Sequence, residues 1–132
     1  MKIIILGIFL FVGTCVTFPS YRDSIPNGHK VPNPCKGSSG LWEGVGHNIL
    51  IGGGQRNVFG KDFAAAKMKW TAELCRKDSD SDGRTNGQEL GDPNCTWTKG
   101  ATPSGSATGH PGVCEPMDLE ACKSVNTAIV CL

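Results

Sequence analysis

The side chains best suited to chemistry in this sequence lie within twelve consecutive residues. Residues 78–89 read DSDSDGRTNGQE, with acidic side chains at the first, third, fifth and twelfth positions and glycine at the sixth. This spacing matches the loop of an EF-hand, in which alternate residues of a tight turn converge on one calcium ion. We therefore predict an EF-hand-like calcium loop with six ligand residues: Asp78, Asp80, Asp82, Arg84, Asn86 and Glu89.

The six residues have different predicted roles at the ion. The three aspartates supply side-chain oxygens, Arg84 supplies its main-chain carbonyl, Asn86 binds directly or through water, and Glu89 closes the shell with two oxygens. Four carboxylates around one dication favour calcium over magnesium, which retains several waters. The alternative is a solvated acidic turn, because Asp, Ser, Gly and Asn are also common loop residues.

Two features of the surrounding sequence indicate a structural ion instead of a calcium-sensing switch. The chain has one such loop, and its eighth position is the polar Thr85. The run Gly91-Asp92-Pro93 is expected to end the exit helix after about one turn. Cys75 and Cys95 flank the loop, whose entering and leaving segments lie close together in this kind of hairpin, so we predict a Cys75–Cys95 disulfide.

Other motifs that carry chemistry are weak or missing. The sequence has no His-Glu-x-x-His, no Gly-x-Ser-x-Gly and no cysteine expected to be free as a nucleophile, so we predict that the protein is not an enzyme. His29, His47 and His110 are far apart, and whether they bind a second metal stays open. Asn94-Cys95-Thr96 is formally a glycosylation sequon, and its occupancy also stays open.

One main helix, over about residues 62–77, is expected to lead into the loop. Asp62 can cap its first turn, and three consecutive alanines favour helix. Its apolar residues Phe63, Ala66, Trp70 and Leu74 share one face. Residues 18–40 are rich in proline and predict an irregular arm, residues 41–60 predict at most one short strand, and residues 100–112 predict a loop.

The N-terminal residues 1–17 are typical of a secretory signal peptide, with Lys2 before a short apolar run. Residues 18–132 are then a single domain that has little apolar sequence for a core but holds six cysteines. Six cysteines in a small secreted chain indicate three disulfides, and 15 pairings are possible. Three of the six lie in the tail after Val113, which we expect to be held by disulfides.

The charge balance narrows the possible partners. Removing Lys2 leaves twelve basic residues against twelve acidic ones, so the secreted chain is formally neutral. Nucleic-acid binding depends on clustered Lys and Arg, and we predict none. The apolar run is too short for a transmembrane helix, so we predict no membrane insertion.

Several blocks in order resemble the temptin family, secreted water-borne pheromones of gastropod molluscs. They include residues 25–35, Gly44-Val-Gly-His47, residues 52–63, residues 78–95 and His110-Pro-Gly-Val-Cys114. The resemblance implies an attractant that acts with other secreted peptides, folded as a disulfide-bonded module likened to EGF-like domains. It also implies a metal at Asp78, Asp80, Asp82 and Glu89, where the spacing had already placed calcium.

The sequence thus predicts a small, disulfide-rich, mostly irregular secreted domain with one main helix, an EF-hand-like loop and little β structure. The predicted function is that of an extracellular pheromone stabilised by calcium and disulfides, acting as a monomer on a receptor or with peptide partners. The alternative is a calcium-dependent structural or adhesion module without a signalling role. Loop and cysteines fit both, and the family resemblance favours the first.

Overall fold

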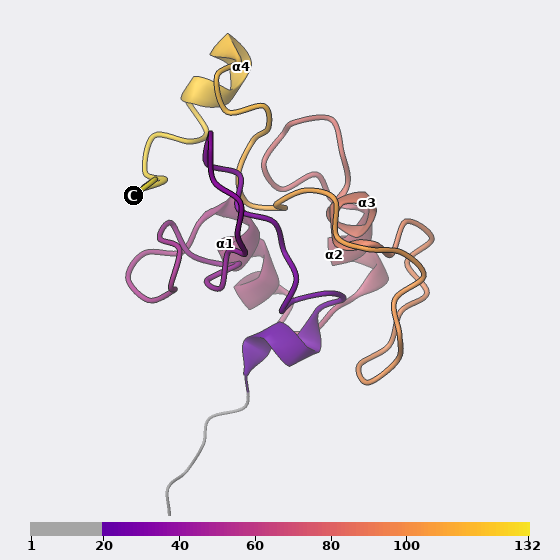
Figure 1. Cartoon of the computed structure of the whole chain (residues 1–132). Helices are drawn as coiled ribbons and strands as arrows, with labels where there is room; N and C mark the ends of the chain where they lie inside the picture. The colour runs from indigo at the N-terminus through magenta and orange to yellow at the C-terminus, as the bar shows by residue number, and fades with distance from the viewer. Residues whose placement is uncertain (1–19) are drawn as a thin grey trace, which may run out of the picture.

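The computed structural model describes residues 20–132, so the predicted signal peptide lies outside the described residues. The chain forms a short 3-10 helix and four short α-helices joined by long loops (Figure 1). The elements are η1 (Tyr21–Ser24), α1 (Val58–Ala65), α2 (Ala72–Arg76), α3 (Asn86–Leu90) and α4 (Glu120–Lys123). No helix in this part of the chain is long and apolar enough to cross a membrane.

Pairing of extended backbone is limited to three isolated bridges within residues 20–132. They join Pro32 with Leu41, His47 with Arg56, and Ile49 with Val130. The one short strand allowed for residues 41–60 is therefore reduced to single bridges. The expectation of a small, disulfide-rich fold with little β structure is confirmed.

The predicted single helix over residues 62–77 is wrong. The structure has two helices there, and α1 begins at Val58 because Asn57, not Asp62, is its N-cap: the Asn57 side chain accepts from Gly60 N at 2.8 Å. Lys67 and Met68 both have φ of +57°, which ends the first helix. Met68 N donates to Phe63 O and Lys67 N to Ala64 O, the pattern of a Schellman motif without its usual glycine.

The core nevertheless includes the four apolar residues that were predicted to share one helix face. Its buried members are Ile25, Val31, Val45, Phe59, Phe63, Leu74 and Leu90, with Ala66, Met68 and Trp70 packed against them. The turn at residues 67–68 lets α2 leave the direction of α1. As a result α2 packs beside α3, and the part of the acidic loop before α3 extends away from the two helices that it joins (Figure 1).

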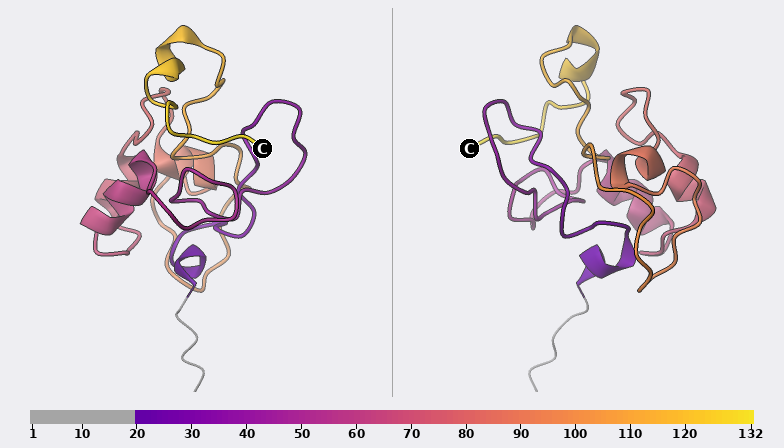
Figure 2. Two further views of the ribbon diagram at one scale, coloured as in Figure 1. Left: turned by 90° about the vertical axis from the view of Figure 1, so that its left-hand side faces the viewer. Right: turned by 45° about the vertical axis from the view of Figure 1, so that its right-hand side comes forward.

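Three disulfides connect the loops. Cys75 pairs with Cys95 as predicted, Cys35 with Cys131, and Cys114 with Cys122. The last two confirm that the tail is held by disulfides. The views in Figure 2 agree with Figure 1 in placing α4 and η1 at opposite ends of the molecule, with the C-terminus between them.

Candidate metal site in the acidic loop

The acidic loop, residues 78–89, is held at both ends by α2 and α3. Thr71 caps α2 by accepting from Leu74 N at 3.1 Å. Thr85 and Gln88 form a capping box at the start of α3, and Gly91, with φ of 81°, ends that helix after about one turn, as predicted. Short, capped helices therefore set the positions of the loop's two ends.

Asn86 links the two helices across the loop. It is fully buried, and its Nδ2 donates to Leu74 O at 2.8 Å and to Ser79 Oγ at 2.9 Å. Its Oδ1 accepts from Ser79 N at 3.4 Å. The amide is thus used to close the loop, and its predicted role as a metal ligand stays a prediction.

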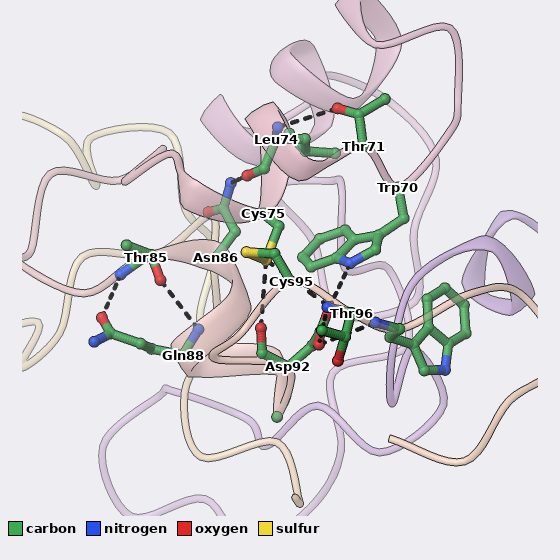
Figure 3. The surroundings of a disulfide bond; sticks show 12 residues. Trp70, Thr71, Leu74, Cys75, Thr85, Asn86, Gln88, Asp92, Cys95 and Thr96 are labelled. Atoms are coloured by element: carbon green, nitrogen blue, oxygen red, sulfur yellow. Dashed lines mark hydrogen bonds between the residues drawn. A yellow bond between two sulfur atoms is a disulfide. The ribbon is translucent and has the colours of Figure 1, made fainter. Parts of the chain in front are cut away.

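The Cys75–Cys95 disulfide reinforces the same closure, as Figure 3 shows. Next to it, the buried Asp92 carboxylate accepts from Trp70 Nε1 and from Thr96 N, both at 2.9 Å, and from Trp97 N at 3.1 Å. Asp92 had been assigned only as part of a helix stop. Its bond with Trp70 joins residues 22 positions apart, which no local pattern shows, whereas the bonds from Thr96 and Trp97 are local.

The carboxylates of the loop converge on a common point. Asp78, Asp80 and Asp82 each offer an oxygen within 4.8 Å of the others, and they are the one such group of potential metal ligands found in residues 20–132. Asp80 and Glu89 are fully buried. Asp80 Oδ2 and both carboxylate oxygens of Glu89 have no hydrogen-bond partner among the described residues.

Burial and repulsion disfavour negative charge at this point. Burial, followed by the charge of Asp82, raises the pKa of Asp80 to about 8. Burial, followed by the charges of Asp80 and Asp82, raises the pKa of Glu89 to about 10, against a smaller lowering by Arg84. A cation among these oxygens would reverse both effects, because it favours the ionised forms.

Main-chain donors hold the remaining carboxylate oxygens in place. Gly83 N donates to Asp78 Oδ2 at 2.9 Å, and Arg84 N donates to Asp82 Oδ1 at 3.0 Å. Asp82 N donates to both Asp78 Oδ1 and Asp80 Oδ1 at 3.2 Å. Gly83 has φ of +93°, a conformation that favours glycine and gives the sharp turn its shape.

Two further residues border the site. The guanidinium of Arg84 donates to Thr108 Oγ1 and so ties the loop to residues 100–112. Glu115, which the spacing did not identify, accepts from His110 N at 2.7 Å, and its own N–H donates to Asp82 Oδ2 at 3.4 Å. Burial, with a smaller contribution from the charge of Asp82, raises the pKa of Glu115.

The three histidines lie in different environments. His29 Nε2 is 2.6 Å from Asp23 Oδ1 at an exposed position. The main chain of His47 forms an isolated β-bridge with that of Arg56. His110 is fully buried, and its ring is edge-on to Trp42. Within residues 20–132 none of them belongs to a group of three potential ligands. Asn94 is exposed, and the middle residue of its sequon, Cys95, is disulfide-bonded.

Fold and site together define a small disulfide-bonded domain with an acidic loop whose ends are fixed by two short helices and a disulfide. A family model described as Temptin C-terminal matches residues 15–113. The chain is also similar to Temptin from Aplysia californica, with 47% identity over 110 residues that cover 83% of this chain and 87% of the relative. No solved structure matches. The chain belongs to the temptin family.

Proposed function

We propose that the acidic loop binds one structural calcium ion. The observation that carries this proposal is the set of three buried carboxylate oxygens, on Asp80 and Glu89, without hydrogen-bond partners among the described residues. Buried polar atoms in proteins are almost always satisfied by a partner, and charged ones by a counterion or metal. Oxygens alone, in the spacing of an EF-hand loop, suit a hard dication.

The predicted ligands fit this ion to different degrees. Asp78, Asp80 and Asp82 already converge, whereas Glu89 is not part of that group; it is fully buried and near enough for the charges of Asp80 and Asp82 to act on its pKa. The main-chain carbonyl of Arg84 remains a proposed ligand. Asn86 Oδ1 accepts a long hydrogen bond from Ser79 N, so we propose that Asn86 acts through water.

The ion stabilises the fold in this proposal and takes no part in a reaction. A metal bound only by the native state adds about 1.4 kcal/mol when its free concentration is about tenfold above the dissociation constant. Thermal unfolding of the secreted chain, with calcium, with magnesium and with a chelator, tests this directly. The proposal would be contradicted if the melting temperature did not change with calcium. It would also be contradicted if the Asp82→Ala variant responded to calcium like the wild type.

We further propose that the protein is a secreted attractant acting with other secreted peptides or on a receptor. The support is membership of the temptin family together with three disulfides, which are typical of extracellular proteins. Binding of a partner, not catalysis, is then the activity.

The test is to measure where the protein goes. The chain is quantified in water conditioned by the source animal and in that animal's extracellular matrix, and the purified protein is then tested for attraction with and without partner peptides. Protein free in the water that attracts conspecifics supports signalling. Protein retained in the matrix and released by a calcium chelator would instead indicate a structural or adhesion module.

A further inference from the structure

A second feature of the molecule, distinct from the acidic loop, is a pocket of about 400 Å³. Its apolar lining comes from Ile25, Val45, Phe59, Phe63 and Met68. Pockets of this volume, lined by apolar side chains and a few polar groups, are typical of sites for small ligands. None of the proposed calcium ligands lines it.

Part of the pocket wall is made of closely approaching backbone at glycine residues. A Cβ on Gly60 would lie 2.0 Å from Gly46 O, and one on Gly44 would lie 2.4 Å from Gly52 Cα. Side chains at these positions are therefore excluded by packing. Because this part of the wall is backbone held in contact, we expect the pocket to exist before any ligand binds.

Apolar surface continues from the pocket to the outside of the molecule. Ile51 is 77% exposed and Tyr21 is 58% exposed, and both line the pocket. The Tyr21 ring is edge-on to Phe63 inside, at 6.5 Å between centroids. Covering such side chains removes apolar area from water, which favours a ligand with an apolar body.

The charges at the pocket favour an anion. Arg22, Arg56 and Glu43 line it, and none of the three takes part in the ion pairs found in residues 20–132. The local balance is one net positive charge, since two guanidinium groups and one carboxylate are among the lining side chains. His47 also lines the pocket, and its Nδ1 is buried without a hydrogen-bond partner in the described part of the chain.

We propose that this pocket binds a small amphiphile with a compact apolar body and one carboxylate head group. The apolar body occupies the lining around Phe59 and Phe63, and Ile51 and Tyr21 cover it at the mouth. The carboxylate pairs with Arg56 or Arg22, because guanidinium matches the geometry of a carboxylate. This proposal does not depend on the calcium proposal, since it uses different residues.

The test uses octanoate as the probe, with octylammonium and neutral octanol as matched ligands of opposite and zero charge. Amide chemical shifts of the protein are followed by NMR during each titration, at one fixed calcium concentration. Octanoate should shift the amides of Val45, Gly46 and Gly52, and octylammonium should bind about tenfold more weakly. No binding, equal binding of octanoate and octylammonium, or shifts confined to residues 78–89 would overturn the proposal.

Two exposed variants locate the site without threatening the fold. Arg56→Gln should weaken octanoate binding about fivefold and leave octanol binding unchanged, because it removes the head-group contact. Ile51→Glu should weaken binding of octanoate more than that of octanol, because it adds a negative charge at the apolar mouth. Arg76→Gln is the matched control, since Arg76 is exposed on α2 and lines no part of this pocket. Equal losses in Arg56→Gln and Arg76→Gln would contradict the assigned site.

Discussion

Replacing Glu89 with glutamine should have opposite effects on stability with and without calcium. Both Glu89 oxygens are buried without partners among the described residues, and burial, followed by the charges of Asp80 and Asp82, raises the pKa of Glu89 to about 10. In the calcium-free protein the Glu89 side chain lowers the free energy of unfolding at neutral pH, because the folded state disfavours its ionised form. With calcium it is a ligand that closes the shell. Glu89→Gln removes both the unfavourable ionisation and the calcium ligand.

The size of each effect follows from the pKa shift and from mass action. At pH 7 the folded, calcium-free state keeps Glu89 protonated while the unfolded state ionises it with a pKa of about 4.5, which costs at most about 3 kcal/mol. Glu89→Gln avoids this cost, but only part of the free energy is recovered because the buried glutamine amide is also without hydrogen-bond partners. We therefore expect calcium-free Glu89→Gln to be more stable than the wild type by about 1–2 kcal/mol. Its response to calcium should be abolished.

The wild type should gain about 1.4 kcal/mol at a calcium concentration tenfold above its dissociation constant. For a chain of this size that gain raises the melting temperature by about 5 °C. Thermal unfolding followed by circular dichroism, over a calcium series at pH 7, measures both quantities. The exposed Glu73→Gln is the matched control and should follow the wild type throughout.

A pH series extends the same experiment. The folded-state pKa of Glu89 is raised, so the calcium-free wild type should lose stability as pH rises from about 4.5 towards 10. Glu89→Gln should show a smaller loss over this range, with Asp80 accounting for what is left. If Glu89→Gln destabilises the calcium-free protein and calcium does not change the melting temperature of the wild type, the reasoning from unsatisfied carboxylates is refuted.

Three further predictions concern stability alone. Asp92→Asn should lower the free energy of unfolding by about 2 kcal/mol, because an amide group replaces one acceptor oxygen, whereas the exposed Asp118→Asn should have no effect. Lys67→Gly should raise it by about 1 kcal/mol, since φ is +57° there, whereas Lys69→Gly should not; equal effects would contradict the helix break. Burial lowers the pKa of His110 to about 3, so the contribution of His110 to stability should fall by up to about 1.4 kcal/mol per pH unit as pH drops from about 6.5 towards 3, opposite in sign to the contributions of Glu89 and Asp80. The difference in stability between the wild type and His110→Phe, measured by chemical denaturation over this range, isolates that contribution, and a difference that does not change with pH would refute the assignment.

The short-range features of this protein could be predicted from the order of its residues. The spacing of carboxylates at 78–89 places them on one turn, and the structure brings Asp78, Asp80 and Asp82 together. Cys75 and Cys95 lie just outside that hairpin, and their pairing is confirmed because the hairpin itself brings them close. Gly91 ends α3 as expected, since only local backbone geometry is involved.

The features that were missed depend on contacts between distant segments. An alanine-rich stretch without glycine or proline predicted one helix, but packing of α2 against α3 and of Trp70 on Asp92 requires a turn at Lys67 and Met68. The pairing of Cys35 with Cys131 spans 96 positions, so no local rule selects it. Glu115 reaches the site from 33 positions beyond Asp82 in the same way.

Sequence by itself determined which residues can meet through one tight turn, because neighbours along the chain have few ways to be arranged. Family membership could also be read there, since its blocks are stretches of consecutive residues. Only the tertiary structure decided which carboxylates are buried without partners, where the main helix breaks, and that Arg22 and Arg56 line one pocket. Burial and desolvation are properties of the packed chain, and they arise from contacts that the order of residues does not specify one at a time.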